Sequence, residues 1–208
     1  MKLKKGHFVI CLITFIFVFF GFVANSNSAT ISPKEQIKET ADRTLAILND
    51  EAISEEAKKA LLRKTILPHM DINEIAKRVL ARHWKPNESR LGEFIPILVE
   101  FLENTYVNRM VFDSAKGASI VVLQEIIDKD YATYATVKSK IITAKGKEIP
   151  VDYRLRFNGN EWKVYDISVE GISMVSNYRS QFNTIIQKSS FDGLLQALRK
   201  KIQELKNK

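Results

Sequence analysis

The side chains best suited to chemistry in this sequence gather in one segment, VEGISMVSNYRSQF, at residues 169–182. The segment leaves a strand-like apolar run, turns at Gly171 and enters a helical pattern. Its polar side chains after the turn are Asn177, Tyr178, Arg179 and Gln181. A guanidinium suits the geometry of phosphate, so Arg179 could grip a phosphate group. It could instead pair with Glu170 or Asp166, and we prefer the interpretation that this polar cluster ties the helix to the preceding strand.

Two histidines outside the N-terminal segment, His69 and His83, are the other candidates for catalysis or metal binding. Neither has a second His, Asp or Glu at a spacing that would place two metal ligands on one helix face. The sequence also contains no G-x-S-x-G elbow, glycine-rich phosphate loop or H-E-x-x-H motif. The pattern therefore predicts a protein that is not an enzyme, with no catalytic residue, no metal ligand and no cofactor.

The N-terminus predicts export from the cytoplasm. Three lysines precede an apolar run over residues 8–23, and small polar residues follow, which is the pattern of a secretory signal peptide. We expect cleavage after Ala29, with Ser26 or Ser28 as alternative sites. The run is short for a membrane span, which needs roughly 20 apolar residues, and an uncleaved anchor is the alternative. The only cysteine, Cys11, lies in this segment, so disulfides are excluded from the mature chain.

Basic residues outnumber acidic ones, giving a formal net charge of +8 at pH 7. Part of the excess lies in the final segment, RKKIQELKNK. Nucleic acid is a poor partner for an exported protein, whereas anionic lipid head groups or an acidic partner would suit this segment. A solvated helix end, with cations near the negative pole of the helix dipole, explains the same residues without any partner.

Apolar residues recur at intervals of three and four from Ser32 to about Phe112, which predicts a series of helices. Capping residues place the starts of three of them, at Ser32 with Pro33, at Ser54 and at Asp71. KPNESR interrupts the third, and a longer helix follows it. The helical pattern returns at the C-terminus, over about 173–188 with Ser173 as its cap and over about 191–206.

Between these helical regions the periodicity changes toward two, which predicts strands. Four strands are expected, over about 119–128, 131–144, 147–158 and 161–169. Turn residues at the junctions, such as Lys145-Gly146 and Asn158-Gly159, favour an antiparallel meander. The fold class is therefore α+β, an antiparallel four-stranded sheet with helices packed on one face. We expect residues 30–208 to form one domain, with a helical part at about 30–116, the sheet at about 117–170 and the C-terminal helices at about 171–208.

Alternation along the strands predicts one apolar and one wet face. In the third strand Val151, Tyr153, Leu155 and Phe157 alternate with Asp152, Arg154 and Arg156. In the fourth strand one alternating set is Tyr165, Ile167 and Val169, and the other set is Trp162 and Val164. An apolar sheet face under helices can close into a tight core or enclose a cavity. From these residues alone a tight core is the commoner arrangement, because protein interiors are normally packed without sizeable voids.

Two long segments resemble the MlaC family, also called the toluene-tolerance family. They are WKVYDISVEGISMVSNYRSQFNTIIQKSSFDGLLQAL at residues 162–198 and DINEIAKRVLARHWKPNESRLGEFIPILVEFLENTY at residues 71–106. The sequence departs from the family pattern at Asp71-Ile72, where an aromatic residue is expected. It departs again at Ser189-Ser190, which replaces a helix break that contains glycine. The resemblance covers nearly the whole mature chain.

The resemblance implies a periplasmic carrier of glycerophospholipid that maintains the lipid asymmetry of the outer membrane in Gram-negative bacteria. Its acyl chains would lie in an apolar cavity near the upper end of the usual range, roughly 1,000 Å³. The implied partners are an inner-membrane ABC transporter complex of the Mla type and an outer-membrane lipoprotein assembly. An enzyme on a similar cone-shaped fold and a periplasmic chaperone or adaptor are the alternatives.

We expect the wall of that cavity to come from the apolar faces of the sheet and of two helices. The periodicity of this sequence, rather than any matched family ligand, selects its residues. From the sheet they are Val137, Ile141, Val151, Tyr153, Leu155, Tyr165, Ile167 and Val169. From the helices they are Val79, Phe94, Leu98 and Phe101. The same periodicity would place them equally well in an ordinary core.

Overall fold

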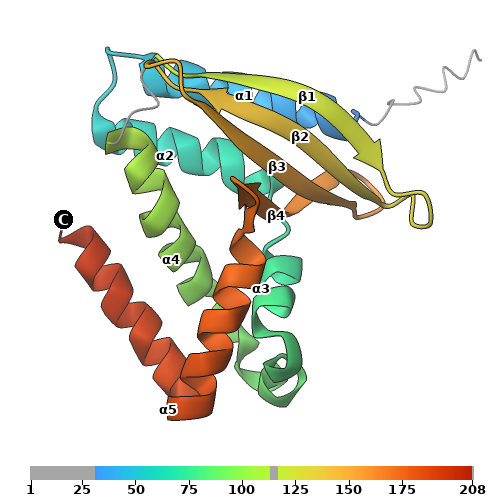
Figure 1. The fold of residues 1–208 in the computed structure, drawn as a ribbon. Coiled ribbons are helices and arrows are strands. Elements are labelled where there is room, and N and C mark those ends of the chain that lie inside the picture. Colours follow the sequence, from blue (N-terminus) through green and yellow to red (C-terminus); the bar gives the residue numbers. More distant parts are fainter. Residues whose placement is uncertain (1–30, 113–116, 208) are drawn as a thin grey trace, which may run out of the picture.

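The computed structural model describes residues 31–112 and 117–207 (Figure 1). The predicted signal peptide, residues 1–29, lies outside this part of the chain together with Cys11. Helices come first, a sheet follows and a long helical segment closes the chain, so the α+β class is confirmed. None of the described helices combines the length and the apolar character needed to cross a membrane.

Local capping fixes the starts of the helices before the sheet. The α-helices are α1 (Pro33–Asn49), α2 (Glu55–Ile66), α3 (Ile72–Leu80) and α4 (Leu91–Phe112), with 3-10 segments at Leu67–His69, Ala81–His83 and Lys85–Arg90. Ser32 and Glu35 form a capping box at α1. Ser54 and Asp71 each accept a hydrogen bond from a backbone N–H in the first turn of α2 and α3. These starts were predicted from the sequence and are confirmed.

The sheet is an antiparallel meander in the order β1-β2-β3-β4-β5. Its strands are β1 (Ser119–Ile127), β2 (Tyr134–Ile142), β3 (Glu148–Phe157), β4 (Trp162–Val169) and β5 (Ile172–Ser173). The prediction of four strands was therefore one short among the described residues. Glu170 and Gly171, both at positive φ, turn the chain tightly enough for two residues to pair back onto β4. A strand of two residues is too short for alternation to reveal it.

A β-bulge between β3 and β4 changes which side chains of β4 face α1. The register between β3 and β4 shifts between Arg154 and Leu155, so Leu155 pairs with Val164 while Tyr153 pairs with Ile167. Val164 and Ile167 therefore share one face, although they are three residues apart. The two alternating sets predicted for this strand were wrong for this reason. Asp166 lies on the opposite face, where it is 2% exposed.

The C-terminal segment, α5 (Met174–Lys206), consists of two helical arms joined at a sharp kink. The kink lies at Ser190, whose φ of 68° and ψ of 178° belong to a region that is essentially reserved for glycine. Figure 1 shows the arms as a V below the sheet. The predicted division into two helices is confirmed, and the break occurs without the glycine that the family pattern contains.

Ser190→Gly is expected to stabilise the protein by about 1 kcal/mol, because glycine adopts this backbone conformation without the steric cost that a side chain incurs. Ser189→Gly is the matched control. Ser189 is helical, so glycine there should lower the free energy of unfolding by about 0.5–1 kcal/mol. Urea unfolding measures both changes, and a destabilised Ser190→Gly variant would show that Ser190 stores no strain.

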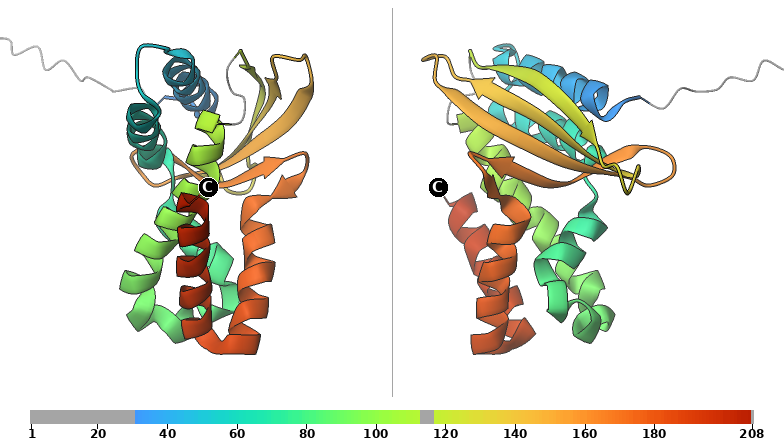
Figure 2. Two further views of the ribbon diagram at one scale, coloured as in Figure 1. Left: turned by 90° about the vertical axis from the view of Figure 1, so that its left-hand side faces the viewer. Right: turned by 45° about the vertical axis from the view of Figure 1, so that its right-hand side comes forward.

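The described helices form two groups around the sheet. In Figure 2, α1 and α2 lie along one side of the sheet, and α3, α4 and α5 form a bundle below its β4 end. The bundle encloses what we call the helical cluster, which includes Ile75, Val79, Leu80, Phe94, Leu98, Phe101, Phe182, Phe191 and Leu194. A second group of buried residues, which we call the sheet cluster, lies between α1 and the sheet and consists of Ile37, Ala135, Val137, Leu155, Trp162 and Val164.

Candidate functional site

A small apolar cavity lies between the helical layer and the inner face of the sheet. Its volume is about 100 Å³. Its lining residues come from α1, from the end of α2 and the turn after it, and from three strands: Ile37, Thr40, Ala41, Thr44, Ile66, His69, Met70, Ile120, Tyr153 and Val164. The small side chain of Ala41 leaves room where a larger residue would close the gap. Burial raises the pKa of the Tyr153 hydroxyl, which keeps it neutral.

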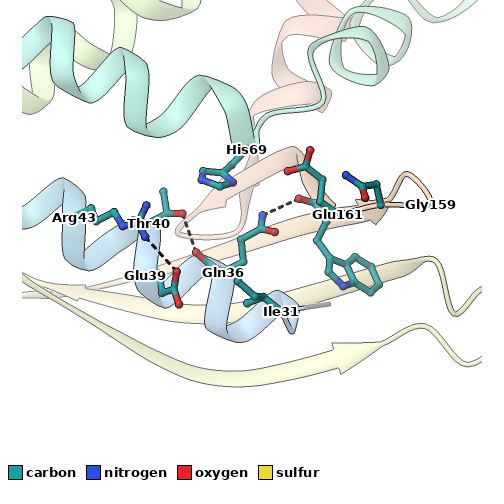
Figure 3. Close-up of a pocket in the computed structure, with 10 residues that line it drawn as sticks. Ile31, Gln36, Glu39, Thr40, Arg43, His69, Gly159 and Glu161 are labelled. Carbon is teal, nitrogen blue, oxygen red and sulfur yellow. Dashed lines mark hydrogen bonds and ion pairs between the residues drawn. The ribbon is translucent and has the colours of Figure 1, made fainter. Parts of the chain in front are cut away.

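A polar pocket of about 380 Å³ adjoins this cavity and shares Thr40 and His69 with it (Figure 3). Charges of both signs line it, since Arg43 and Glu39 pair at 3.5 Å and Glu161 stands on the far side. The remaining lining residues are Ile31, Gln36, Gly159, Asn160 and Trp162. The amide of Gln36 donates a hydrogen bond of 2.7 Å to the carbonyl of Trp162, which ties α1 to β4. An apolar space next to a polar one can accommodate an amphipathic molecule.

His69 stands at the junction of the two pockets. Its Nδ1 atom is buried and has no hydrogen-bond partner among the described residues. The pKa of His69 is lowered from its ordinary value, first because burial disfavours the imidazolium and second because Lys163 repels it. The Nζ of Lys163 is held nearby, where it donates to the carbonyl of Pro68. The neutral imidazole is therefore the form that suits the folded protein.

This shift predicts a loss of stability on acidification. Between its folded and unfolded pKa values His69 binds fewer protons in the folded state, so the free energy of unfolding falls as pH drops through the unfolded value of about 6.5. His69→Leu is expected to flatten the stability profile between about pH 7.5 and pH 5.5, as measured by urea unfolding at several pH values. The control variant His83→Leu retains His69. Its free energy of unfolding should therefore still fall with pH by the contribution of His69. Identical slopes in wild type and His69→Leu would contradict the assignment.

The predicted wall residues divide between the two clusters. Tyr153 lines the cavity, Val137 and Leu155 belong to the sheet cluster, and Ile167 packs against it. Val79, Phe94, Leu98 and Phe101 belong instead to the helical cluster, and Tyr165 packs against them. Val151 is buried, Ile141 is half-buried and Val169 is 44% exposed. The structure therefore does not bring the twelve residues together into one wall.

The cavity residues that periodicity analysis omitted come mostly from α1 and from the turn after α2. Ile37 and Ala41 lie one helical turn apart on the apolar face of α1, which was visible in the sequence. Nothing in that periodicity distinguished α1 from the other helices as the one facing the sheet. Met70 follows the turn after α2 and forms an isolated parallel bridge with Val164, a contact between distant segments that no local pattern indicates.

The polar cluster that opens α5 makes its contacts to α3, to α4 and within α5, so its predicted contacts to the sheet were wrong. The Nε of Arg179 donates to the carbonyl of Arg78 at 2.9 Å, so it ties α5 to α3 and not to Asp166 or Glu170. Tyr178 contacts the hydroxyl of Tyr106 on α4 at 3.2 Å. Gln181 bonds within its own helix, to Asn177 at 3.1 Å.

Asp166 makes the contacts to α5 that were assigned to those residues. Its carboxylate accepts hydrogen bonds from the Ser173 hydroxyl at 2.6 Å and from the Val175 N–H at 3.0 Å, and Arg154 lies 3.5 Å away. Ser173 in turn caps α5, as predicted, by accepting from the N–H of Ser176. A buried carboxylate on β4 thus fixes the start of the last helix.

Among residues 31–112 and 117–207, no three histidine or carboxylate side chains lie close enough together to hold a metal ion.

Comparison with models of known protein families identifies the family of this chain. The family model described as MlaC protein matches residues 38–200. The chain belongs to the MlaC family. The cavity under α1 is therefore a cavity of a protein of the MlaC family.

Two curated relatives and one solved structure extend this MlaC assignment. The chain is 24% identical over 203 residues to the intermembrane phospholipid transport system binding protein MlaC of Haemophilus influenzae, covering 94% of this chain and 92% of that protein. It is 25% identical to toluene tolerance protein ttg2D of Pseudomonas putida, over 63% of this chain and 60% of the relative. The fold matches a phospholipid-binding protein from Ralstonia solanacearum, solved with a phospholipid, with a TM-score of 0.75 at 22% identity, covering 84% of this chain and 99% of that chain.

Proposed function

We propose that this protein binds a glycerophospholipid with its acyl chains between α1 and the inner face of the sheet, and carries it between the outer and inner membranes. The observation that supports this proposal is the apolar cavity under α1, which continues into a polar pocket at Thr40 and His69. A neighbouring apolar and polar space matches the two parts of a phospholipid. The names of the relatives from Haemophilus influenzae and Ralstonia solanacearum supply the ligand class.

The energetics explain why such a lipid needs a carrier. Two acyl chains with about 30 methylenes would cost roughly 24 kcal/mol to expose to water, at about 0.8 kcal/mol for each methylene. Unassisted transfer through water is therefore negligible. Shielding the chains needs no catalytic group, which agrees with our proposal of a carrier that is not an enzyme.

The cavity must widen to accept these chains. Its volume of about 100 Å³ is well below the roughly 300–1,000 Å³ of typical ligand pockets. Hydrogen bonds that hold α1 to the sheet include those from Gln36 to the Trp162 carbonyl and from the N–H of Lys34 to Glu125, both at 2.7 Å. The sheet cluster between α1 and the strands is apolar, so acyl chains can replace its contacts when α1 moves away from the sheet.

The polar pocket is the place we propose for the head group. Arg43, Gln36 and Asn160 offer donors, and Glu39 and Glu161 offer acceptors. This mixture suits a head group that carries both a phosphate and an amine. It also predicts little preference for lipids of high negative charge.

Export and docking complete the proposal. We propose that residues 1–29 direct the chain to the periplasm, and that it works there with an inner-membrane ABC transporter complex of the Mla type and an outer-membrane lipoprotein assembly. In that setting it would maintain the lipid asymmetry of the outer membrane. Support comes from the N-terminal pattern and from the transport system named for the Haemophilus influenzae relative.

Native mass spectrometry tests the proposal. The full-length chain is expressed in a Gram-negative host, collected from the periplasmic fraction without detergent, and analysed before and after solvent extraction. We expect a mass excess equal to one diacyl phospholipid that extraction removes. A mass without lipid that persists after incubation with vesicles of phosphatidylethanolamine and phosphatidylglycerol would refute it.

A further inference from the structure

A third pocket, in the helical bundle, has the chemistry of an anion site. It lies between the end of α3 and the first arm of α5, has a volume of about 320 Å³, and is lined by Leu80, Ala81, Arg82, His83, Arg179, Ser180 and Asn183. Two guanidinium groups, an imidazole, a hydroxyl and an amide therefore meet around one space. None of the lining residues is acidic.

In this pocket the guanidinium of Arg82 is hydrogen-bonded to the Oδ1 of Asn183 and, through its Nε, to the Nε2 of His83 at 3.5 Å. The Oδ1 of Asn183 accepts from the Nη2 of Arg82 at 2.5 Å and lies 3.0 Å from the Nε2 of His83. The Nδ2 of the same amide is directed at Gln187, 3.3 Å away, which fixes the amide with its oxygen toward Arg82. An amide oxygen carries no net charge, so the cationic group of Arg82 has a hydrogen bond here without a neutralising partner.

Arg179 brings a second guanidinium to the same space. Its Nε is fixed by the carbonyl of Arg78 at 2.9 Å, which leaves its two terminal nitrogens without a partner among the described residues. The nearest acidic residue on α3 does not neutralise it, because Glu74 is already paired with Arg78 at 2.7 Å. A guanidinium held through Nε presents its remaining donors in the fork that suits phosphate oxygens.

The backbone that positions Arg82 and His83 is strained. Ala81 ends α3 with φ 47° and ψ −115°, a conformation that side-chain-bearing residues rarely adopt. This turn directs two consecutive residues, Arg82 and His83, at Asn183 on α5. Strain of this kind persists only where the surrounding structure holds it in place, and it is common at ligand-binding sites.

We infer that this pocket binds a phosphate group, either as inorganic phosphate or as the head group of an anionic phospholipid at a membrane surface. Arg82 and Arg179 provide the charge-assisted hydrogen bonds. The site is separate from the cavity under α1, so it would act on a group other than the carried lipid.

Titration with inorganic phosphate tests the site. The mature protein, purified from the periplasmic fraction and labelled with nitrogen-15, is titrated at constant ionic strength while the Nε–H signals of arginine are followed by NMR. We expect saturable shifts for Arg82 and Arg179. Arg82→Gln and Arg179→Gln should each weaken binding about tenfold, since hydrogen bonds to charged groups are among the stronger ones. Lys200→Gln, an equal change of charge on the exposed face of the second arm of α5, should change it less than twofold.

Vesicles identify the source of the phosphate. If Arg82→Gln and Arg179→Gln reduce sedimentation with phosphatidylglycerol vesicles, and inorganic phosphate competes, the ligand is a lipid head group. If only phosphate binding weakens, it is a free anion. Shifts that do not saturate, or equal losses in Lys200→Gln, would overturn the inference. The fraction of protein that carries lipid is measured in the same variants and should not change, so this result is independent of the proposed carriage.

Discussion

Ala41→Leu is expected to lower the fraction of purified protein that carries lipid by about tenfold or more. Ala41 is 7% exposed on α1 and lines the apolar cavity of about 100 Å³. Three additional carbon atoms would fill much of that space and stabilise the closed arrangement by up to about 2 kcal/mol. A preference of about 1.4 kcal/mol for the closed form already lowers the population of the open form tenfold.

Native mass spectrometry gives the loaded fraction, and urea unfolding shows whether the variant is folded. Ala46→Leu is the matched control, because Ala46 lies on the exposed side of the same helix. It should carry as much lipid as the wild type. Undiminished lipid in Ala41→Leu, with its stability unchanged, would place the acyl chains elsewhere in the molecule.

Asp166→Ala is expected to destabilise the protein by about 3 kcal/mol. Asp166 is 2% exposed and accepts from both Ser173 and Val175, so its loss leaves a buried N–H and a hydroxyl without their acceptor. Hydrogen bonds to a charged group contribute about 1.5–3 kcal/mol each, and an unsatisfied buried donor costs about 1–3 kcal/mol. The start of α5 should loosen from β4 as a result.

Two comparison variants separate this effect from a general loss of charge. Asp152→Ala removes a carboxylate from the adjacent strand, where the side chain is only half-buried, and should cost less than about 1 kcal/mol. Asp166→Asn keeps the shape and one acceptor oxygen, so it should fall between alanine and the wild type. These values come from urea unfolding, and hydrogen exchange at Val175 reports the local loosening. A cost in Asp166→Ala no larger than that in Asp152→Ala would argue against this anchor.

Sequence patterns predicted most of the elements because those elements depend on nearby residues. Ser32, Ser54 and Asp71 cap helices within three residues of themselves, and alternation in β3 defines its buried face. The break at Ser190 was also indicated. The predicted helical faces are correct too, since Phe94 and Leu98 are fully buried.

Contacts between distant segments could not be predicted in the same way. The bulge in β4 depends on how β3 pairs with it, and a single added residue reverses which side chains face the helices. The environment of Val79 and Phe101 was unpredictable for a similar reason. An apolar stripe shows that one face of a helix is buried, but it does not show which element covers that face. Whether those residues pack in the helical cluster or line a cavity is decided by α5, which follows the whole sheet in the sequence.

The separation of α3 and α4 from α5 along the chain also sets the order in which the molecule can assemble. Helices α3 and α4 pack against α5, and the whole sheet lies between α4 and α5 in the sequence. Contacts so far apart form slowly, because a long loop must close before they contribute. While the chain emerges from the ribosome N-terminus first, Phe94 and Leu98 stay uncovered until Phe191 and Leu194 have followed. The newly made chain therefore passes through an aggregation-prone stage that ends only when its final helix has packed.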